Sequence, residues 1–305
     1  MGAYLLARLG QSAVAVACVL VLSFFMVRLT GDPAVVMLPQ EATAADVAAF
    51  RQAMGFDRPL AVQFWEFLRQ AAIGDFGKSL QYRTSARVLI VERLPATMEL
   101  ASASLAFAVA VAVPLGILAA ARRGSVWDWL AQSFALLGQA LPAYWVGLIL
   151  IIVLSVHLHL FPVAGRSGLS SLVLPMVTLA MALLGRLTQL ARSVMLEVLG
   201  QDYIRTARSK GLRGRAIYYR HALKNAAIPL LTMIGVNFGY LLGGSVLIES
   251  VFAWPGIGRL AALAVFQRDF PLVQAVAFFS SVVVLGVNLA TDLLYGVLNP
   301  LVRYR

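Results

Sequence analysis

Long apolar runs alternate with shorter polar stretches along most of this chain. Six runs stand out, and they cover Leu9–Val27, Ala96–Ala121, Leu130–Val156, Leu172–Leu184, Ala226–Ile248 and Leu272–Leu298. Most are close to the roughly 20 residues with which an α-helix crosses about 30 Å of hydrocarbon. The third run is interrupted at Leu141-Pro142, and the fourth continues as helix into a polar segment. The pattern predicts an all-α integral membrane protein with six transmembrane helices.

The apolar runs divide the chain into three parts. Residues 1–29 hold the first transmembrane helix, residues 30–95 a mixed polar segment, and residues 96–305 a core of five helices with a basic loop at 189–225. In the polar segment we expect amphipathic helices at Ala44–Met54 and Leu60–Ala72. The segment also contains Gly-Lys-Ser, as at the end of a phosphate-binding loop, but Ala72 stands where that loop needs glycine. We therefore expect no nucleotide site there.

Composition supports the membrane interpretation and excludes several classes of function. Hydrophobic residues make up 60% of the chain, which is too many for an ordinary soluble domain. The formal net charge is +11, but apolar runs separate the charges, so we do not expect nucleic acid as a partner. Cys18 is the only cysteine, and a single thiol provides neither a disulfide framework nor a thiolate metal cluster. The residues indicate neither a metal site nor a cofactor.

The distribution of Lys and Arg over the short loops predicts the orientation of the helices. One side of the predicted membrane holds Arg8, Arg122, Arg123, the 189–225 loop, Arg303 and Arg305. The short loops on the other side hold only Arg166, Arg259 and Arg268. Basic residues beside apolar segments favour the cytoplasmic side. We therefore expect both termini and the basic loop in the cytoplasm, with the 30–95 segment outside.

The basic loop contains a short helix whose two ends are marked by residue type. Asp202 is a candidate N-cap, since its carboxylate can accept the first free backbone N–H groups. Gly211 is suited to the left-handed conformation that closes a helix. Between them, apolar Ile204 and Ala207 alternate with basic residues. A helix this short is unstable alone in water, so we expect it to pack on a partner surface.

Two features inside the apolar runs are candidates for a transport pathway. Gly235, Gly239 and Gly243 recur every fourth residue and make a stripe where another helix or a passing solute could approach the backbone. In the last run, Asn288 and Asp292 share one helix face, and a carboxylate near lipid depth normally faces protein or water. Plain helix packing for the glycines and a structural ion pair for the carboxylate remain open alternatives.

The basic loop carries a family resemblance. Ala207-x-x-x-Gly211, followed by a basic helix that leads into the fifth run, resembles the EAA loop of the inner-membrane permeases of ATP-binding cassette (ABC) importers. Arg205 and Thr206 stand in place of that pattern's Glu and Ala, and Leu223-Lys224 in place of its later Leu-Pro. This variant is typical of the peptide/nickel subfamily of these permeases.

Further motifs that resemble the first permease subunit of that subfamily occur in order over the whole chain. They are GDPA (31–34), FDRPLAVQF (56–64), GDFGKSL (74–80), RLPATMELA (93–101), LPAYW (141–145), ESVFAWPGIGRL (249–260), RDFPLVQ (268–274) and NLATDLLYGVLNP (288–300). The chain is therefore similar to the dipeptide and oligopeptide permeases of bacteria. The resemblance implies a multi-pass protein of the bacterial inner membrane with the type I fold of ABC importer permeases.

The resemblance also implies partners and site residues. A separate ATPase subunit would bind ATP and Mg²⁺, a second permease would complete the pathway, and an extracytoplasmic substrate-binding protein would deliver di- or oligopeptides. This chain would itself be no enzyme. The residues that would couple it to the ATPase are Tyr203, Ile204, Arg205, Thr206, Ala207, Arg208, Lys210, Gly211 and Leu212. Ala207 would allow close approach, and the 30–95 segment and the loop from Glu249 to Phe270 would dock the binding protein or form an outer gate.

Three other functions remain compatible with the residues. The same fold could import nickel, a nickel chelate or another small solute, and His157 and His159 resemble metal ligands only faintly. A secondary transporter driven by protons or sodium would need no ATPase, but such carriers usually have internal repeats and charges at the bilayer midplane. A membrane scaffold that does not transport would also suit the basic loop. Co-purification with an ATPase distinguishes the importer from the last two.

Overall fold

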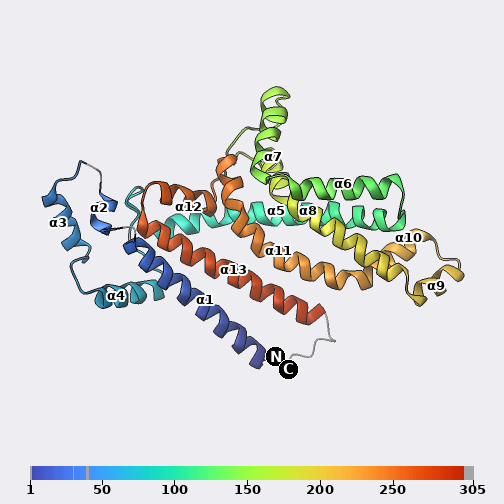
Figure 1. Cartoon of the computed structure of the whole chain (residues 1–305), viewed down its shortest axis with the longest axis horizontal. Helices are drawn as coiled ribbons and strands as arrows, with labels where there is room; N and C mark the ends of the chain where they lie inside the picture. The colour runs from blue at the N-terminus through green and yellow to red at the C-terminus, as the bar shows by residue number, and fades with distance from the viewer. Residues whose placement is uncertain (1, 30, 39–40, 299–305) are drawn as a thin grey trace. The chain divides into compact units, whose positions relative to one another are not determined.

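The computed structural model describes residues 2–29, 31–38 and 41–298. Over these residues the structure is helical, with one isolated bridge between Lys78 and Ser85. Figure 1 shows the elements in chain order. The helices are α1 (Gly2–Leu29), α2 (Pro33–Met37), α3 (Ala44–Ala53), α4 (Leu60–Ala72), α5 (Ala86–Ala121), α6 (Val126–Ala140), α7 (Ala143–Leu150), the π-helix η1 (Ile151–His157), α8 (Leu169–Leu199), α9 (Asp202–Ser209), α10 (Gly214–Ala216), the π-helix η2 (Ile217–Ala222), α11 (Leu223–Val251), α12 (Ile257–Phe266) and α13 (Phe270–Leu298).

The described helices confirm the all-α membrane fold. Five helical stretches are long and apolar enough to cross a bilayer, and they lie in α1, α5, α8, α10–α11 and α13. The sixth predicted span is a pair, α6 and α7–η1, bent by 103°. Pro142 begins the second half of this pair and Leu141 before it is extended, because proline disfavours helical conformation in the preceding residue.

The chain divides into two compact units. The first takes in the described residues of Met1–Ala96 and Pro255–Gly286, and the second those of Thr97–Trp254 and Val287–Arg303. In the second unit, α8 packs against α6, α7 and α11. A Cβ on Gly185 of α8 would lie 2.3 Å from the carbonyl oxygen of Ala135 in α6, so only glycine allows this close approach.

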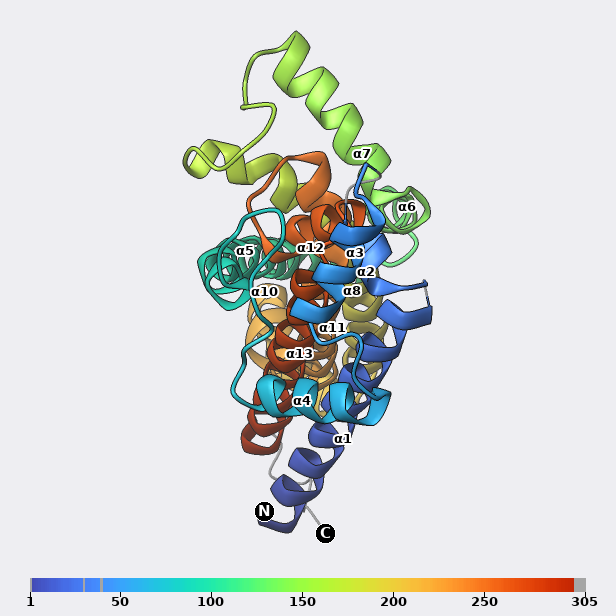
Figure 2. The ribbon, with the colours of Figure 1, turned by 90° about the vertical axis from the view of Figure 1, so that its left-hand side faces the viewer.

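Aromatic side chains form much of the core of the first unit. The rings of Phe24 in α1 and Phe64 in α4 have centroids 5.0 Å apart, and those of Phe76 and Phe278 are 5.1 Å apart. Figure 2 shows α4 running across the direction of α1. Helix α4 has the predicted bounds and turns one face, which includes Phe67, toward this core.

A buried carboxylate joins two of the sequence motifs in the first unit. Asp269 of RDFPLVQ is fully buried and accepts a hydrogen bond from the hydroxyl of Ser79 in GDFGKSL. It also accepts the backbone N–H groups of Gln81 and Leu272, each at 3.3 Å, and so caps the start of α13. This one carboxylate therefore links the two motifs and the start of α13.

Candidate coupling site

Helix α9 is the short helix that the sequence predicts in the basic loop. Gln201, not Asp202, is the N-cap residue, and Asp202 is the first helical residue. The predicted N-cap is thus wrong by one position, although a carboxylate in the first turn still interacts favourably with the helix dipole. At the other end, Gly211 has a φ of +76°, as predicted. The N–H groups of Gly211 and Leu212 bond to the carbonyls of Arg208 and Ala207, at 2.9 and 3.3 Å, which closes the helix.

The inner face of α9 is buried in the chain's own core. Ile204 is fully buried, and Ala207 is 8% exposed. Both belong to a hydrophobic cluster with Ile117 of α5, Met195 of α8 and Ile217 of η2. The partner surface that so short a helix needs is therefore supplied by this chain. The side chain of Ala207 packs in this cluster, and its predicted role in a close approach to the ATPase stays a prediction.

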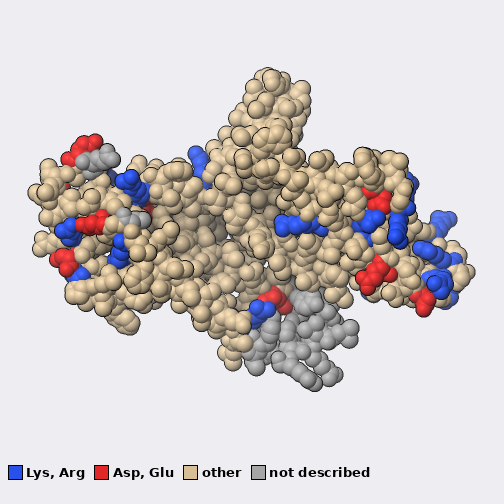
Figure 3. Space-filling view, in the orientation of Figure 1, with Lys and Arg blue, Asp and Glu red and all other residues tan. Residues whose placement is uncertain are grey.

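The outer face of α9 is polar and basic. Arg205 and Asp202 form an ion pair at 3.4 Å whose side chains are 81% and 93% exposed, so it contributes little to stability. Figure 3 shows Lys and Arg gathered over α9 and α10. The exposed residues of α9 and the turn that follows are Asp202, Tyr203, Arg205, Thr206, Arg208, Ser209, Lys210, Gly211, Leu212 and Arg213. We name this set the coupling surface. Its positive charge suits an acidic partner.

Two further contacts position α9. The side-chain amide of Asn225 in α11 donates a hydrogen bond of 2.6 Å to the phenol oxygen of Tyr203. Directly after α10, residues Ile217–Ala222 form the π-helix η2, with Ile217 in the same cluster as Ile204. Sequence patterns did not predict this element. π-helical turns are rare and occur frequently at functional sites.

The glycines of the predicted pathway stripe have different surroundings in the structure. A Cβ on Gly235 would lie 1.8 Å from Cγ2 of Thr291 in α13, so Gly235 serves close helix packing. Gly243 is exposed, with nothing within 4 Å of its Cβ position, and Gly239 is partly buried. On α13, Asn288 is exposed and Asp292 partly buried. A role of these residues in the pathway stays a prediction.

The last pathway candidate, Glu249, is fully buried at the end of α11. Its Oε1 accepts a hydrogen bond of 2.8 Å from the hydroxyl of Thr97 in α5. A second carboxylate two residues further along α5, that of Glu99, forms an ion pair with Arg166 at 2.5 Å. The loop before α8 is further held by a hydrogen bond of 2.8 Å from the N–H of Gly165 to the carbonyl of Phe252. Glu249 thus faces the interior of its unit, and its role in a gate stays a prediction.

Comparison with known proteins shows the family to which the chain belongs. The profile of the family described as binding-protein-dependent transport system inner membrane component matches residues 112–304, and that of the family's N-terminal region matches residues 1–101. The glutathione transport system permease protein GsiC of Salmonella typhimurium is 39% identical, with 99% of each chain covered. The dipeptide transport system permease protein DppB of Escherichia coli is 36% identical, again with 99% of each chain covered.

A solved structure shares the fold. A chain of the methionine ABC transporter MetNI, in an inward-facing conformation, superposes with a TM-score of 0.57 and 17% identity, covering 70% of this chain and 97% of that chain. The family assignment rests on the profile matches and on the full-length similarity to transport permeases. The chain belongs to the family of binding-protein-dependent transport system inner membrane components.

Proposed function

We propose that this chain, together with a second permease subunit, forms the path by which an ABC importer brings short peptides into the cell. A separate ATPase subunit would bind the coupling surface of α9 and drive the change between inward- and outward-facing states. The chain would take no part in hydrolysis itself. An extracytoplasmic binding protein would deliver the peptides to the side that carries the 30–95 segment.

The observation that carries this proposal is the two-sided packing of α9. Its inner face is joined through Ile204 to α5, α8 and η2, while its outer face exposes charge. A force applied to the outer face would therefore reach several helices at once. Transport also requires the ATPase to bind the two permease states with different affinity, since equal affinity shifts no equilibrium. Bonds such as that between Tyr203 and Asn225 are candidates for contacts that change between the states.

The cargo is inferred from the relatives. Those compared are named for transport of glutathione, which is a tripeptide, and of dipeptides. The similarity extends over 99% of the chain and includes the external segment as well as the helical core. We therefore assign short peptides to this importer, in preference to nickel or another small solute.

The basic residues support the proposed orientation. The coupling surface must face the cytoplasm to meet an ATPase, and the Lys and Arg of this loop favour that side. In this orientation both termini are cytoplasmic, and α2, α3 and α4 lie outside. Labelling of single cysteines in intact cells tests it, because a reagent that does not cross the membrane should modify Gln52→Cys, at an exposed position of α3, and leave Arg205→Cys untouched.

Uptake assays test the cargo. A strain that lacks this chain should lose uptake of a radiolabelled dipeptide and recover it when the chain is restored. Nickel uptake measured in the same strains is the control. Loss of nickel uptake with intact uptake of di- and tripeptides would contradict the peptide assignment and leave the fold and family unaffected.

A further inference from the structure

A small cavity lies in the first unit where two membrane spans end. Its walls come from the last turns of α1, the first turn of α13, the end of α2, the turn between α3 and α4, α4 itself and the loop after it. The span in α1 ends at Leu29, and the span in α13 begins at Phe270. The cavity therefore lies where the hydrocarbon of the bilayer gives way to water.

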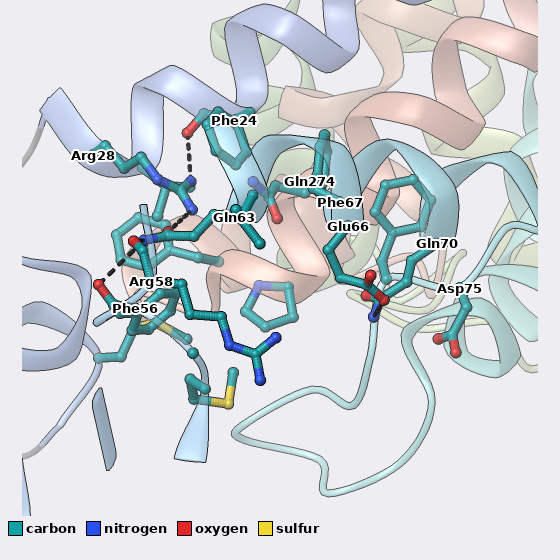
Figure 4. A pocket seen from close by; sticks show the side chains of 18 residues that line it. Phe24, Arg28, Phe56, Arg58, Gln63, Glu66, Phe67, Gln70, Asp75 and Gln274 are labelled. Atoms are coloured by element: carbon teal, nitrogen blue, oxygen red, sulfur yellow. Dashed lines mark hydrogen bonds between the residues drawn. The ribbon is translucent and has the colours of Figure 1, made fainter. Parts of the chain in front are cut away.

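Opposite charges line opposite sides of this cavity, as Figure 4 shows. Arg28 and Arg58 lie on one side, and Glu66 and Asp75 lie on the other. The guanidinium group of Arg28 donates hydrogen bonds to the carbonyl of Phe24 at 3.0 Å and to the side-chain amide oxygen of Gln63 at 2.5 Å. This arrangement is complementary to a molecule that carries both an anionic and a cationic group.

The remaining charges in the cavity have no partner of opposite charge among the residues that the structure describes. Arg58 is exposed and makes no ion pair there. Glu66 accepts a hydrogen bond from the neutral amide of Gln70 at 3.0 Å, and Asp75 accepts one from the N–H of Gly77 at 2.9 Å. Neither hydrogen bond neutralises its carboxylate, so both carboxylates can receive an incoming ammonium group.

The size of the cavity limits what it can hold. Its volume is about 190 Å³. Pockets that enclose a whole small ligand typically measure about 300–1,000 Å³. Phe24, Phe67 and Phe270 supply apolar walls beside the charged groups. A polar headgroup whose apolar remainder stays outside fits this space better than a complete peptide does.

Helix α4, which forms one wall, has features of a helix that lies in the membrane interface. Trp65, in the middle of α4, and Ile73, the residue that caps its C-terminus, are 71% and 70% exposed, although both are large and apolar. Tryptophan is enriched where hydrocarbon meets headgroups, and amphipathic helices can lie in that plane. The cavity on the inner side of α4 is thus at the depth of the lipid headgroups.

We propose that this cavity binds the headgroup of a phospholipid with a primary amine, such as phosphatidylethanolamine. Arg28 and Arg58 hold the phosphate, and Glu66 and Asp75 accept hydrogen bonds from the ammonium group. The acyl chains remain in the bilayer beside α1. The assignment rests on the membrane location of the chain and is independent of its transported cargo.

Native mass spectrometry of the full-length chain, purified in detergent with the subunits that accompany it, tests the proposal. Phosphatidylethanolamine, phosphatidylglycerol and phosphatidylcholine with the same acyl chains are titrated separately. The first should bind about tenfold more tightly than the other two, because only it pairs a phosphate with an ammonium group that can donate hydrogen bonds.

Variants at exposed positions identify the site without disturbing the core. Arg58→Gln should weaken binding of phosphatidylethanolamine about tenfold, and Glu66→Gln should remove its preference over phosphatidylglycerol. Arg69→Gln, on α4 outside the cavity, is the matched control and should bind as the unchanged chain does. Equal binding of all three lipids, or equal binding by all variants, would overturn the proposal. Displacement of phosphatidylethanolamine by diglycine would instead assign the site to free peptides and likewise refute the lipid assignment.

Discussion

Asp128 of α6 and Arg192 of α8 form a bidentate ion pair that holds the first turn of α6 against α8. Nε of Arg192 lies 2.6 Å from Oδ1 of Asp128, and Nη2 lies 2.8 Å from Oδ2. Oδ2 also accepts the backbone N–H of Gly124 at 3.0 Å. The two side chains are 8% and 25% exposed, respectively. Arg192 therefore fixes two helices together and is no part of the coupling surface, although it lies in the basic loop of the sequence.

Breaking this pair should destabilise the second unit. Asp128→Leu and Arg192→Met each leave one charge of the pair without its partner, and in each we expect the free energy of unfolding to fall by about 3 kcal/mol. The double variant Asp128→Leu with Arg192→Met removes both charges and should recover most of that loss. Denaturant unfolding of the purified chain, carried out as a double-mutant cycle, measures both. Additive losses in the double variant would show that the pair is not coupled.

Substitution of Gly211 should separate ATP hydrolysis from transport. Proline cannot adopt the φ of +76° found there and removes the N–H that bonds to Arg208, at a local cost of about 3 kcal/mol. Gly211→Pro should insert and assemble normally, and its complex should hydrolyse ATP while peptide uptake is lost. Gly211→Asn is the matched control, because asparagine tolerates the left-handed conformation. Normal peptide uptake by the proline variant would show that the C-terminal cap of α9 at Gly211 is not needed for coupling.

Substitution by alanine at the two ends of the glycine stripe should change the free energy of unfolding differently. At Gly235 a Cβ would meet Thr291, so Gly235→Ala should destabilise the packing of α11 on α13 by about 1–3 kcal/mol. At Gly243 nothing lies near the Cβ position, and alanine is the better helix former by about 1 kcal/mol. Gly243→Ala should therefore be neutral or stabilising. Unfolding of the two variants under the same conditions makes the comparison, and equal losses would contradict it.

Much of the fold was predictable because apolar length and helix signals are local. Helix α4 has the predicted bounds Leu60–Ala72, and α3 ends one residue before the predicted Met54. The start of α5 at Ala86, upstream of the predicted Ala96, was missed because its first turns carry charge. The 103° bend between α6 and α7 depends on packing against other helices, so the sequence showed only the interruption at Pro142.

The candidate site was predictable in position but not in orientation. The spacing of Ile204 and Ala207 places both on one face of α9, and that periodicity could have indicated a buried face. Which neighbours cover this face depends on contacts with α5 and α8, far away in the sequence. The bond between Ser79 and Asp269 joins residues 190 positions apart, so no local pattern could reveal it.

Site-directed crosslinking tests most directly whether α9 contacts the ATPase. Cys18 is the only cysteine, so a Cys18→Ser chain accepts single reporter cysteines. In the assembled complex, Arg205→Cys on the exposed face of α9 should crosslink to the ATPase subunit, in a yield that changes when ATP is bound. Ile204→Cys, at a fully buried position of the same helix, and Trp65→Cys, on α4, should not. Absence of any product from Arg205→Cys, with crosslinking from Trp65→Cys instead, would contradict the account.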